Sequence, residues 1–351
     1  MVDKNQFSVS VREIRDSLDY ERGVAPLISK VIETEDRLHV LVPDRAEKSL
    51  LLGPGGRVVA KLSEVFGTPI TVHSNCELLL RERQLRLTFQ RIGKLLSDSS
   101  PNQKPILQQL RLDIEKEMEY PRRQIDMRKE DTGTIVAVAF SGGVDSGAAL
   151  YWATRQTRSV ISLTADLGCQ VMGNPEKRAI RYISENLEIS QYFIDASSNL
   201  EKIFEGAIKE KLHPCGRCHR TLMESIRNSA RDLGVDLLLT GELLPTGRQS
   251  IELMDDLMII HLPATLSLSK YRTRKISSCL GMKHKQERFG CRLLSRCHQK
   301  GWKMIGPSIY RVLRETEAGI LSTGQSLQQI KNILGPSLEC LKKRNRAKND
   351  C

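Results

Sequence analysis

Two short segments of this 351-residue chain combine residue types that can do chemistry. The first is Ser-Gly-Gly-Val-Asp-Ser at residues 141–146, directly after the apolar run 134–140, which predicts a buried parallel strand. Two glycines let the backbone turn sharply and present N–H groups to an anion, and the serines add hydroxyl donors. A helix is expected to follow, with its positive end at the same place. The segment therefore predicts a phosphate-binding loop, although it matches neither the kinase-type loop nor Gly-x-Gly-x-x-Gly.

The second segment is Cys215-Gly-Arg-Cys218, a spacing at which two sulfur atoms can converge on one metal or on one another. Haem attachment uses Cys-x-x-Cys-His, but it needs export, and the first residues lack the apolar core of a signal peptide. A structural zinc site would need a second close pair, which the sequence lacks. An iron–sulfur cluster or a sulfur-carrying thiol pair remains, and the adjacent Arg217, His219 and Arg220 are expected to favour the thiolate.

The elements that must position these segments follow from the apolar pattern after residue 134. Apolar runs alternate with helix-like segments, which predicts an α/β fold with a parallel, doubly wound sheet covered on both faces. Ligands of such open sheets bind at the carboxyl ends of the strands, where residues 141–146 are expected. The expected strands are 134–140, 159–165, 191–196, 235–241 and 256–264, and the expected helices are 146–157, 175–187, 198–211 and 219–233.

Residues 138–146, Val-Ala-Phe-Ser-Gly-Gly-Val-Asp-Ser, resemble the SGGxDS signature of the PP-loop ATPase superfamily, whose members cleave ATP to AMP and pyrophosphate. The resemblance extends from residue 134 to the region of residue 270 and implies an adenine nucleotide α-hydrolase-like fold. It also implies that Asp166, at the end of the second strand, meets the adenosine. The residues implied to hold the pyrophosphate end of ATP, with Mg²⁺ nearby, are Ser141, Gly142, Gly143, Asp145 and Ser146.

The order of Cys-x-x-Cys, helix and strand over residues 215–242 resembles the tRNA-thiolating branch of this superfamily. Those enzymes often bind a 4Fe–4S cluster through the pair and one further cysteine, which leaves the fourth iron open for sulfide. The resemblance implies Cys291 as the third ligand, with Cys297 as the second choice. The alternative is a persulfide shuttle, in which Cys215 or Cys218 carries the sulfur and the other resolves it.

The turn Thr240-Gly241-Glu242 departs from the Gly-His-x-x-Asp-Asp pattern of the 2-thiocytidine and 2-thiouridine enzymes. It is closer to the Thr-Gly-Glu of 4-thiouridine synthases, so the target base stays open. Gly241 and Glu242 are expected at the nucleotide site. Gln249 is either a polar partner on the same loop or a solvated glutamine.

Residues 27–73 predict a smaller α+β unit with two strands around Glu35-Asp36, two helices and a third strand. The Gly-x-x-Gly between the helices resembles that of a KH domain, whose loop clamps a single-stranded nucleic-acid backbone. A helix C-cap followed by a turn would also explain the glycines. The implied RNA-binding residues are Gly53, Gly55, Gly56 and Arg57. Basic residues of the next expected helix extend that surface or merely solvate the helix: Arg81, Arg83, Arg86, Arg91 and Lys94.

Charge is distributed unevenly along the chain. Residues 134–269 carry 13 basic and 16 acidic residues, whereas residues 270–303 carry 11 basic residues and one acid, Glu287. Such a basic strip points to a polyanion, most often nucleic acid, although a solvated surface has the same composition. The expected domains are a KH-like domain at 1–76, a helical linker at 77–133, a PP-loop domain with the basic strip at 134–305, and C-terminal helices with a basic tail at 306–351.

The composition, 40% hydrophobic and 27% charged, suits a globular protein rather than a disordered or collagen-like one. No apolar stretch approaches the ~18–20 uncharged residues that a membrane span needs. Nine cysteines without an export signal are typical of cytosolic thiols. We therefore expect a cytoplasmic protein without a membrane partner.

Together these features predict an ATP-dependent, AMP- and pyrophosphate-forming transferase that replaces a tRNA base oxygen with sulfur. ATP would adenylate the base carbonyl, and Cys215, Cys218 and Asp145 are the expected catalytic residues. The expected partners are tRNA and a sulfur donor, whether sulfide, a desulfurase or a carrier. Two alternatives stay open: a cluster-bearing RNA-binding protein without catalysis, and a PP-loop ligase that uses an amine nucleophile. The target nucleotide, the donor and the oligomeric state, homodimer included, stay open too.

Overall fold

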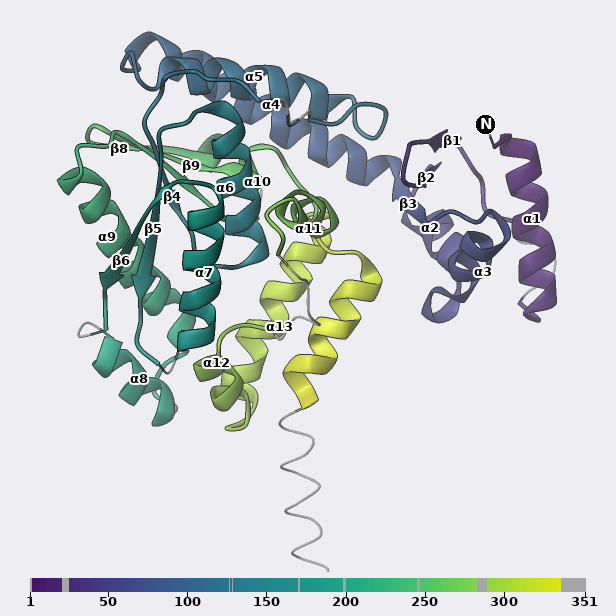
Figure 1. Ribbon diagram of the computed structural model, residues 1–351. Helices are drawn as coiled ribbons and strands as arrows, with labels where there is room; N and C mark the ends of the chain where they lie inside the picture. The colour runs from purple at the N-terminus through teal and green to yellow at the C-terminus, as the bar shows by residue number, and fades with distance from the viewer. Residues whose placement is uncertain are drawn as a thin grey trace, which may run out of the picture. The chain divides into compact units, whose positions relative to one another are not determined.

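The chain folds into two compact units in the computed structural model (Figure 1). The first unit comprises Met1–Arg86 with Asp113–Ile125, and the second comprises Leu87–Leu112 with Asp126–Cys351. Each unit has a hydrophobic core of its own. The residues that the structure describes are 2–20, 25–125, 127, 129–169, 171–197, 200–244, 247–282 and 289–335.

The first unit is built on a three-stranded sheet in the order β1-β2-β3, with β1 antiparallel and β3 parallel to β2. Leu38, Val40 and Val42 of β2 are buried together with Phe7 of α1 and Leu62 of α3. The strands and helices predicted within residues 27–73 are confirmed, and α1 precedes them. The elements are α1 (Lys4–Ser17), β1 (Lys30–Glu33), β2 (Leu38–Val42), α2 (Arg45–Leu52), η1 (Pro54–Gly56), α3 (Arg57–Val65) and β3 (Ile70–Ser74).

Two long helices, α4 (Asn75–Asp98) and α5 (Lys104–Met118), contribute residues to both units. They run side by side, with Arg111 of α5 stacked 4.5 Å from the ring centroid of Phe89 of α4 (Figure 1). The turn between them belongs to the second unit and is held to the residue that precedes β7, because Asn102 Nδ2 donates to Asp236 Oδ1 at 2.6 Å.

The second unit contains a six-stranded sheet in the order β6-β5-β4-β7-β9-β8. The strands β6, β5, β4, β7 and β9 are parallel to one another, as predicted. The sixth strand, β8, runs antiparallel to β9 and was not predicted. The reason is the two-residue turn Asp255-Asp256, which is too short for a crossover and forms a hairpin. The strands are β4 (Val136–Ala139), β5 (Val160–Asp166), β6 (Ser190–Asp195), β7 (Leu237–Thr240), β8 (Ile251–Met254) and β9 (Leu257–His261).

Helices cover both faces of this sheet, which makes the fold doubly wound. Figure 1 shows α9 on the opposite side of the sheet from α6 and α7. Met223, Ile226 and Ala230 of α9 join the sheet residues Leu163 and Leu238 in one core. The helices are α6 (Val144–Gln156), α7 (Asn174–Asn186), α8 (Glu201–Ile208), α9 (Pro214–Asp232), α10 (Leu262–Thr265), α11 (Lys270–Ser278), α12 (Arg292–His298) and α13 (Trp302–Glu317), with a short 3-10 turn η3 (Gly247–Ser250).

The strand order places the predicted loop at the point where the topology reverses. From β4, the chain builds outward through β5 and β6 and then returns to place β7 on the other side of β4. The crevice at the carboxyl ends of such a pair is the usual ligand site of an open α/β sheet. None of the described helices is long and apolar enough to cross a membrane.

The Gly-x-x-Gly turn of the first unit gives a testable contrast between two glycines. Gly53 has φ +67° and ψ 169°, and a Cβ there would lie 2.4 Å from Val58 Cγ2, whereas Gly55 has φ +63° and no atom within 4 Å. Gly53→Ala should destabilise the unit by ~2–4 kcal/mol through strain and overpacking. Gly55→Ala should cost about 1 kcal/mol, the penalty of a left-handed residue. Hydrogen exchange of the α3 amides in the full chain measures the destabilisation caused by each substitution. Equal protection in the two variants would contradict the close contact between Gly53 and Val58.

Candidate functional site

The loop after β4 is closed by one hydroxyl group. Ser146 Oγ accepts a hydrogen bond from Ser141 N at 3.2 Å and donates one to Gly143 O at 3.1 Å. Gly142 has φ +73°, and a Cβ there would approach Ile180 Cγ1 to 3.0 Å, so glycine alone fits without strain. Gly143 is the N-cap of α6, which puts the positive end of that helix at the turn. The turn has the shape and the donors of an anion-binding loop.

Asp145, in the first turn of α6, faces α11. Its carboxylate accepts hydrogen bonds from Lys270 Nζ at 2.8 Å and from Thr273 Oγ1 at 2.9 Å. Both partners belong to the basic strip that the sequence suggested for RNA, and the Lys270 side chain is only 13% exposed. Part of the basic strip therefore binds and orients a carboxylate of the loop instead of facing an RNA. No local spacing could reveal this pair, because 125 residues separate Asp145 from Lys270.

Asp166 ends β5, next to the loop strand, and lies in register with Asp195 at the end of β6. Lys177 of α7 forms an ion pair with Asp166, and Gly168 N donates to Asp166 Oδ1 at 3.0 Å. Hydrogen bonds from Ser197 hold the pKa of Asp195 below its usual value. Asp166 therefore lies at the carboxyl edge, as predicted, and a lysine neutralises it there.

The turn after β7 packs directly against the loop. A Cβ on Gly241 would lie 2.4 Å from Ser146 N and 2.8 Å from Asp145 C, both backbone atoms of α6. Thr240, just before it, is buried, and its Oγ1 lies 2.7 Å from His261 Nδ1 of β9. Glycine at 241 is thus required by the closeness of two backbones.

The same turn reaches the cysteine helix one residue later. Glu242 Oε1 lies 3.4 Å from His219 Nε2, beside the second cysteine of the pair in α9. Arg311 of α13 is bonded to Glu315 Oε1 at 2.8 Å. Against the effect of burial, its pKa is raised by Glu315 and then by Glu242 and Cys215. Gly241 and Glu242 therefore bring the loop and the cysteines to two sides of one turn.

Four cysteines gather on this side of the unit. Burial, followed by the nearby Cys291, raises the pKa of Cys215 and that of Cys218 to about 11. The buried Cys297 also raises the pKa of Cys215. The pKa of Cys297 itself is raised by burial and by Cys291. The expected thiolate at the pair is therefore wrong, because desolvation of the sulfurs outweighs the neighbouring basic residues.

A cluster fits these cysteines by the chemistry of the donors. Cysteine sulfur is the soft ligand that iron–sulfur clusters require, and the four candidates are half-buried or buried: Cys215, Cys218, Cys291 and Cys297. Within the described ranges, however, no three His, Cys, Asp or Glu side chains are arranged to hold a metal ion. The ligand assignment of Cys215, Cys218 and Cys291 therefore stays a prediction.

A hydrogen-bonded bridge that the sequence did not suggest ties the two cysteine-bearing helices. Ser308 Oγ of α13 lies 2.8 Å from His298 Nε2 and 3.5 Å from His213 Nε2. His298 follows the buried cysteine of α12, and His213 is the N-cap of α9. Burial lowers the pKa of His213 and lowers that of His298 to about 4. Neutral imidazoles thus hold the helices together without adding charge.

Two groups of predicted residues lie elsewhere. Gln249 belongs to η3 and lines a pocket beside β8, the terminal strand of the sheet, three strands from β4. The four glycine-loop residues belong to the first unit, where Arg57 begins α3 and is exposed. Within the basic strip, residues 283–288 lie outside the described residues.

Residues 135–228, which hold the loop and most of α9, match the family described as Queuosine biosynthesis protein QueC. This match supports the predicted PP-loop ATPase assignment for the region of residues 135–228. A tRNA-specific 2-thiouridylase MnmA of Rickettsia massiliae is 29% identical to it over 127 residues, 32% of this chain and 35% of that protein. The MnmA 2 of Clostridium botulinum (strain Hall) is 31% identical over 118 residues. The chain thus spans about a third of the length of the thiouridylases that it matches.

Two further similarities cover more of the chain. An uncharacterized protein of Methanocaldococcus jannaschii is 28% identical over 258 residues, 73% of this chain and 94% of that protein. The U34-tRNA thiolase NcsA from Methanococcus maripaludis, with its 4Fe–4S cluster, aligns with 59% of this chain and 72% of its own at 14% identity and a TM-score of 0.38.

Gly241→Ala tests the contact between the turn and the PP-loop. The added Cβ should push the start of α6 outward at a cost of ~1–3 kcal/mol, and ATP binding should weaken by roughly 5- to 150-fold if the loop bears that cost. Gly324→Ala is the control, because no atom lies within 4 Å of its Cβ position. Equilibrium ATP titration of both variants measures the effect. Unchanged affinity in Gly241→Ala would show that the contact does not shape the loop.

Alkylation of the metal-free protein tests the state of the buried thiols. With a pKa of about 11, Cys215 and Cys218 are protonated at pH 7.5, so iodoacetamide should label them far more slowly than the exposed Cys76 and Cys279. Their labelling rate should rise about tenfold per pH unit up to pH 10, because the thiolate fraction does. Peptide mass spectrometry follows each site. A rate at the pair that levels off near pH 8 would contradict the raised pKa.

Proposed function

We propose that this chain is a PP-loop protein that acts as an ATP-dependent tRNA sulfurtransferase. The observation that carries the proposal is the turn at residues 240–242, which touches the PP-loop at Gly241 and the cysteine helix at Glu242. A nucleotide on the loop and a sulfur on the cysteines would therefore flank the same substrate atom. The similarity to tRNA-specific 2-thiouridylases supports the same reaction class.

The PP-loop would serve the first half of the reaction. A base carbonyl oxygen attacks the α-phosphorus of ATP, the bond to pyrophosphate breaks, and an adenylated base forms. Residues 141–143 and Ser146 would present N–H and hydroxyl donors to the pyrophosphate as its charge develops. Asp145, oriented by Lys270 and Thr273, would hold Mg²⁺ on the phosphates, and Asp166 would contact the adenosine.

The cysteines would serve the second half. Sulfur attacks the activated carbon, the C–S bond forms, and AMP leaves with the former carbonyl oxygen. A 4Fe–4S cluster on Cys215, Cys218 and Cys291, or with Cys297 as the third ligand, would supply sulfide at an iron without a protein ligand. In the alternative, a persulfide on Cys215 or Cys218 attacks through its terminal sulfur. The other thiol then releases the thiolated base and closes a disulfide.

The RNA would be held by the first unit and by the remainder of the basic strip. A helix, a Gly-x-x-Gly turn, a second helix and a strand parallel to the preceding one support a KH-like assignment. Gly53, Gly55 and Gly56 all have positive φ, so the turn exposes backbone rather than side chains. Arg57 is exposed beside it and would add a charge for the RNA backbone.

Two products separate the halves of the proposed reaction: pyrophosphate and thionucleoside. The wild type should release pyrophosphate only with tRNA and ATP together. Asp145→Asn should lower both products by roughly 100-fold, since it weakens charge stabilisation at the phosphates. Cys215→Ala should keep pyrophosphate release but lower thionucleoside by about 100-fold or more, as expected when a group needed for sulfur transfer is absent. Cys279→Ala, at an exposed cysteine, should match the wild type.

Purified tRNA nucleosides are quantified by mass spectrometry beside a pyrophosphate assay. Absence of tRNA-dependent pyrophosphate release would instead support a binding protein without catalysis. Pyrophosphate release with a new amine-linked nucleoside, and unchanged thionucleosides on gene deletion, would support the ligase alternative.

A further inference from the structure

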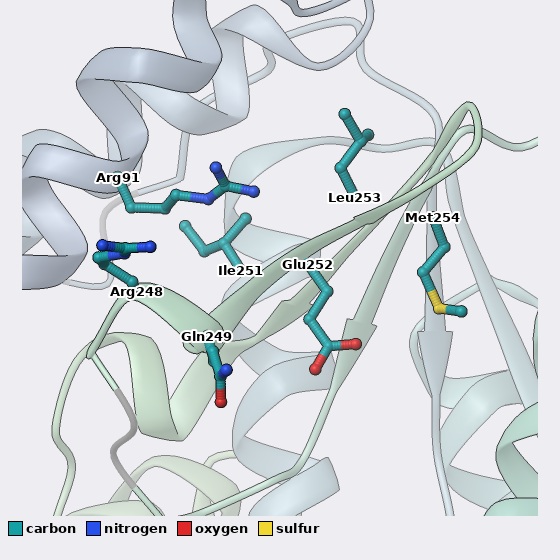
Figure 2. A pocket seen from close by; sticks show the side chains of 7 residues that line it. All are labelled: Arg91, Arg248, Gln249, Ile251, Glu252, Leu253 and Met254. Carbon is teal, nitrogen blue, oxygen red and sulfur yellow. The ribbon is translucent and has the colours of Figure 1, made fainter.

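The second unit has a pocket of about 470 Å³ that the reaction outlined above does not use. It is lined by Arg91 of α4, by residues of η3 and by the edge strand β8. Figure 2 shows the Arg91 and Arg248 side chains close to each other at one end, while Leu253 and Met254 lie along the strand toward the other end.

The two arginines are not paired with a carboxylate among the residues that the structure describes. Across those ranges, neither Arg91 nor Arg248 forms a hydrogen bond or an ion pair. The pocket also contains one carboxylate, Glu252, whose Oε1 lies 3.6 Å from His261 Nε2, so the lining has two positive charges and one negative charge. Two unpaired guanidinium groups around one hollow repel each other, so the site favours an anion between them.

The frame that brings the arginines together is rigid and buried. Thr88, one helical turn before Arg91, donates from Oγ1 to Gly247 O at 3.1 Å and lies 3.2 Å from Ser250 Oγ. Thr88 and Ser250 are 1% and 0% exposed. These contacts lock α4 onto η3 on both sides of Arg248, so the two guanidinium groups are held near each other before any ligand arrives.

The antiparallel direction of β8 places this pocket at the chemically active edge. Ile251, the first residue of β8, pairs with Ile260 near the carboxyl end of β9, and that row continues through Leu239 to Val138 of β4. Three strand spacings separate Ile251 from Val138, about 14 Å. Arg248, just before β8, and Arg91 beside it thus lie within reach of a polymer whose target base is at the PP-loop.

We propose that Arg91 and Arg248 form a phosphate-binding subsite for the backbone of the RNA substrate, beside the base being modified. The inference rests on the proposed function, which supplies the RNA. Guanidinium groups present forked N–H donors that match phosphate oxygens, and they are less strongly hydrated than lysine. Arg227, whose Nη1 lies 3.5 Å from Met254 Sδ, carries positive charge to the other end of the strand.

Salt-dependent binding of a tRNA transcript to the full chain tests the subsite. Removal of one arginine–phosphate interaction should lower the slope of log K against log salt by ~0.7–0.9. Arg91→Gln with Arg248→Gln should therefore lower the slope by about 1.5 and weaken binding roughly tenfold or more at low salt. Arg91→Lys with Arg248→Lys should keep most of the slope. The control is Arg158→Gln, compared with each single glutamine variant, because it removes the same one charge from a side chain that is 78% exposed, just before β5 at the opposite edge.

Steady-state kinetics adds a second readout. The double glutamine variant should raise the KM for tRNA about tenfold and leave the KM for ATP unchanged, because the arginines contact only RNA. Wild-type affinity and slope in the double variant, with normal thiolation, would overturn the subsite and leave the proposed function standing. Loss of binding to polyglutamate but not to tRNA would assign the pocket to an acidic polypeptide and likewise overturn it. A wild type that binds no tRNA would overturn both.

Discussion

The structure of the second unit depends on one close approach, between the backbone of Gly241 and the first turn of α6. At 2.4 Å from Ser146 N, no Cβ can be placed there. The contact fixes where the chain leaves β7 relative to the PP-loop, and the following residue consequently faces α9. Because β4 and β7 are adjacent and parallel, a shift of this turn would move the loop and the cysteine side together.

Electrostatics divide the site into two different environments. The loop side carries carboxylates that are each matched by a lysine, Asp145 by Lys270 and Asp166 by Lys177. The cysteine side gains little charge from its thiols and buried histidines, because burial keeps the thiols protonated and the histidines neutral. Charged phosphates suit the first environment. Sulfur becomes nucleophilic in the second only when something displaces the thiol proton, which metal coordination or a more acidic persulfide achieves.

Local patterns made most of the sheet and the PP-loop predictable from sequence. Buried parallel strands are continuous apolar runs, and a glycine turn before a helix has few other uses. Helix α1 could also have been predicted, since Phe7, Val11 and Ile14 follow helical spacing and are buried. The pairing of Asp145 with Lys270 and the hydrogen bonds at Ser308 could not be predicted from the sequence. They join residues that are far apart in the chain, and residues of these types have many other roles. The pKa of Cys215 was misjudged because burial, unlike neighbouring charge, cannot be read from adjacent residues.

The hairpin at β8 shows how one short turn changes what the sheet edge can do. A parallel strand at that position would begin at the amino edge, far from the PP-loop, and residues before it would face away from the substrate. The antiparallel strand instead begins at the carboxyl edge, since Ile251 pairs with Ile260. Its first residues thereby share an edge with the nucleotide loop, and its Leu253 and Met254 side chains are exposed. Because this one strand is reversed, the residues that precede it lie at the same edge of the sheet as the PP-loop. The buried core that positions the loop and the cysteines is unchanged by this reversal.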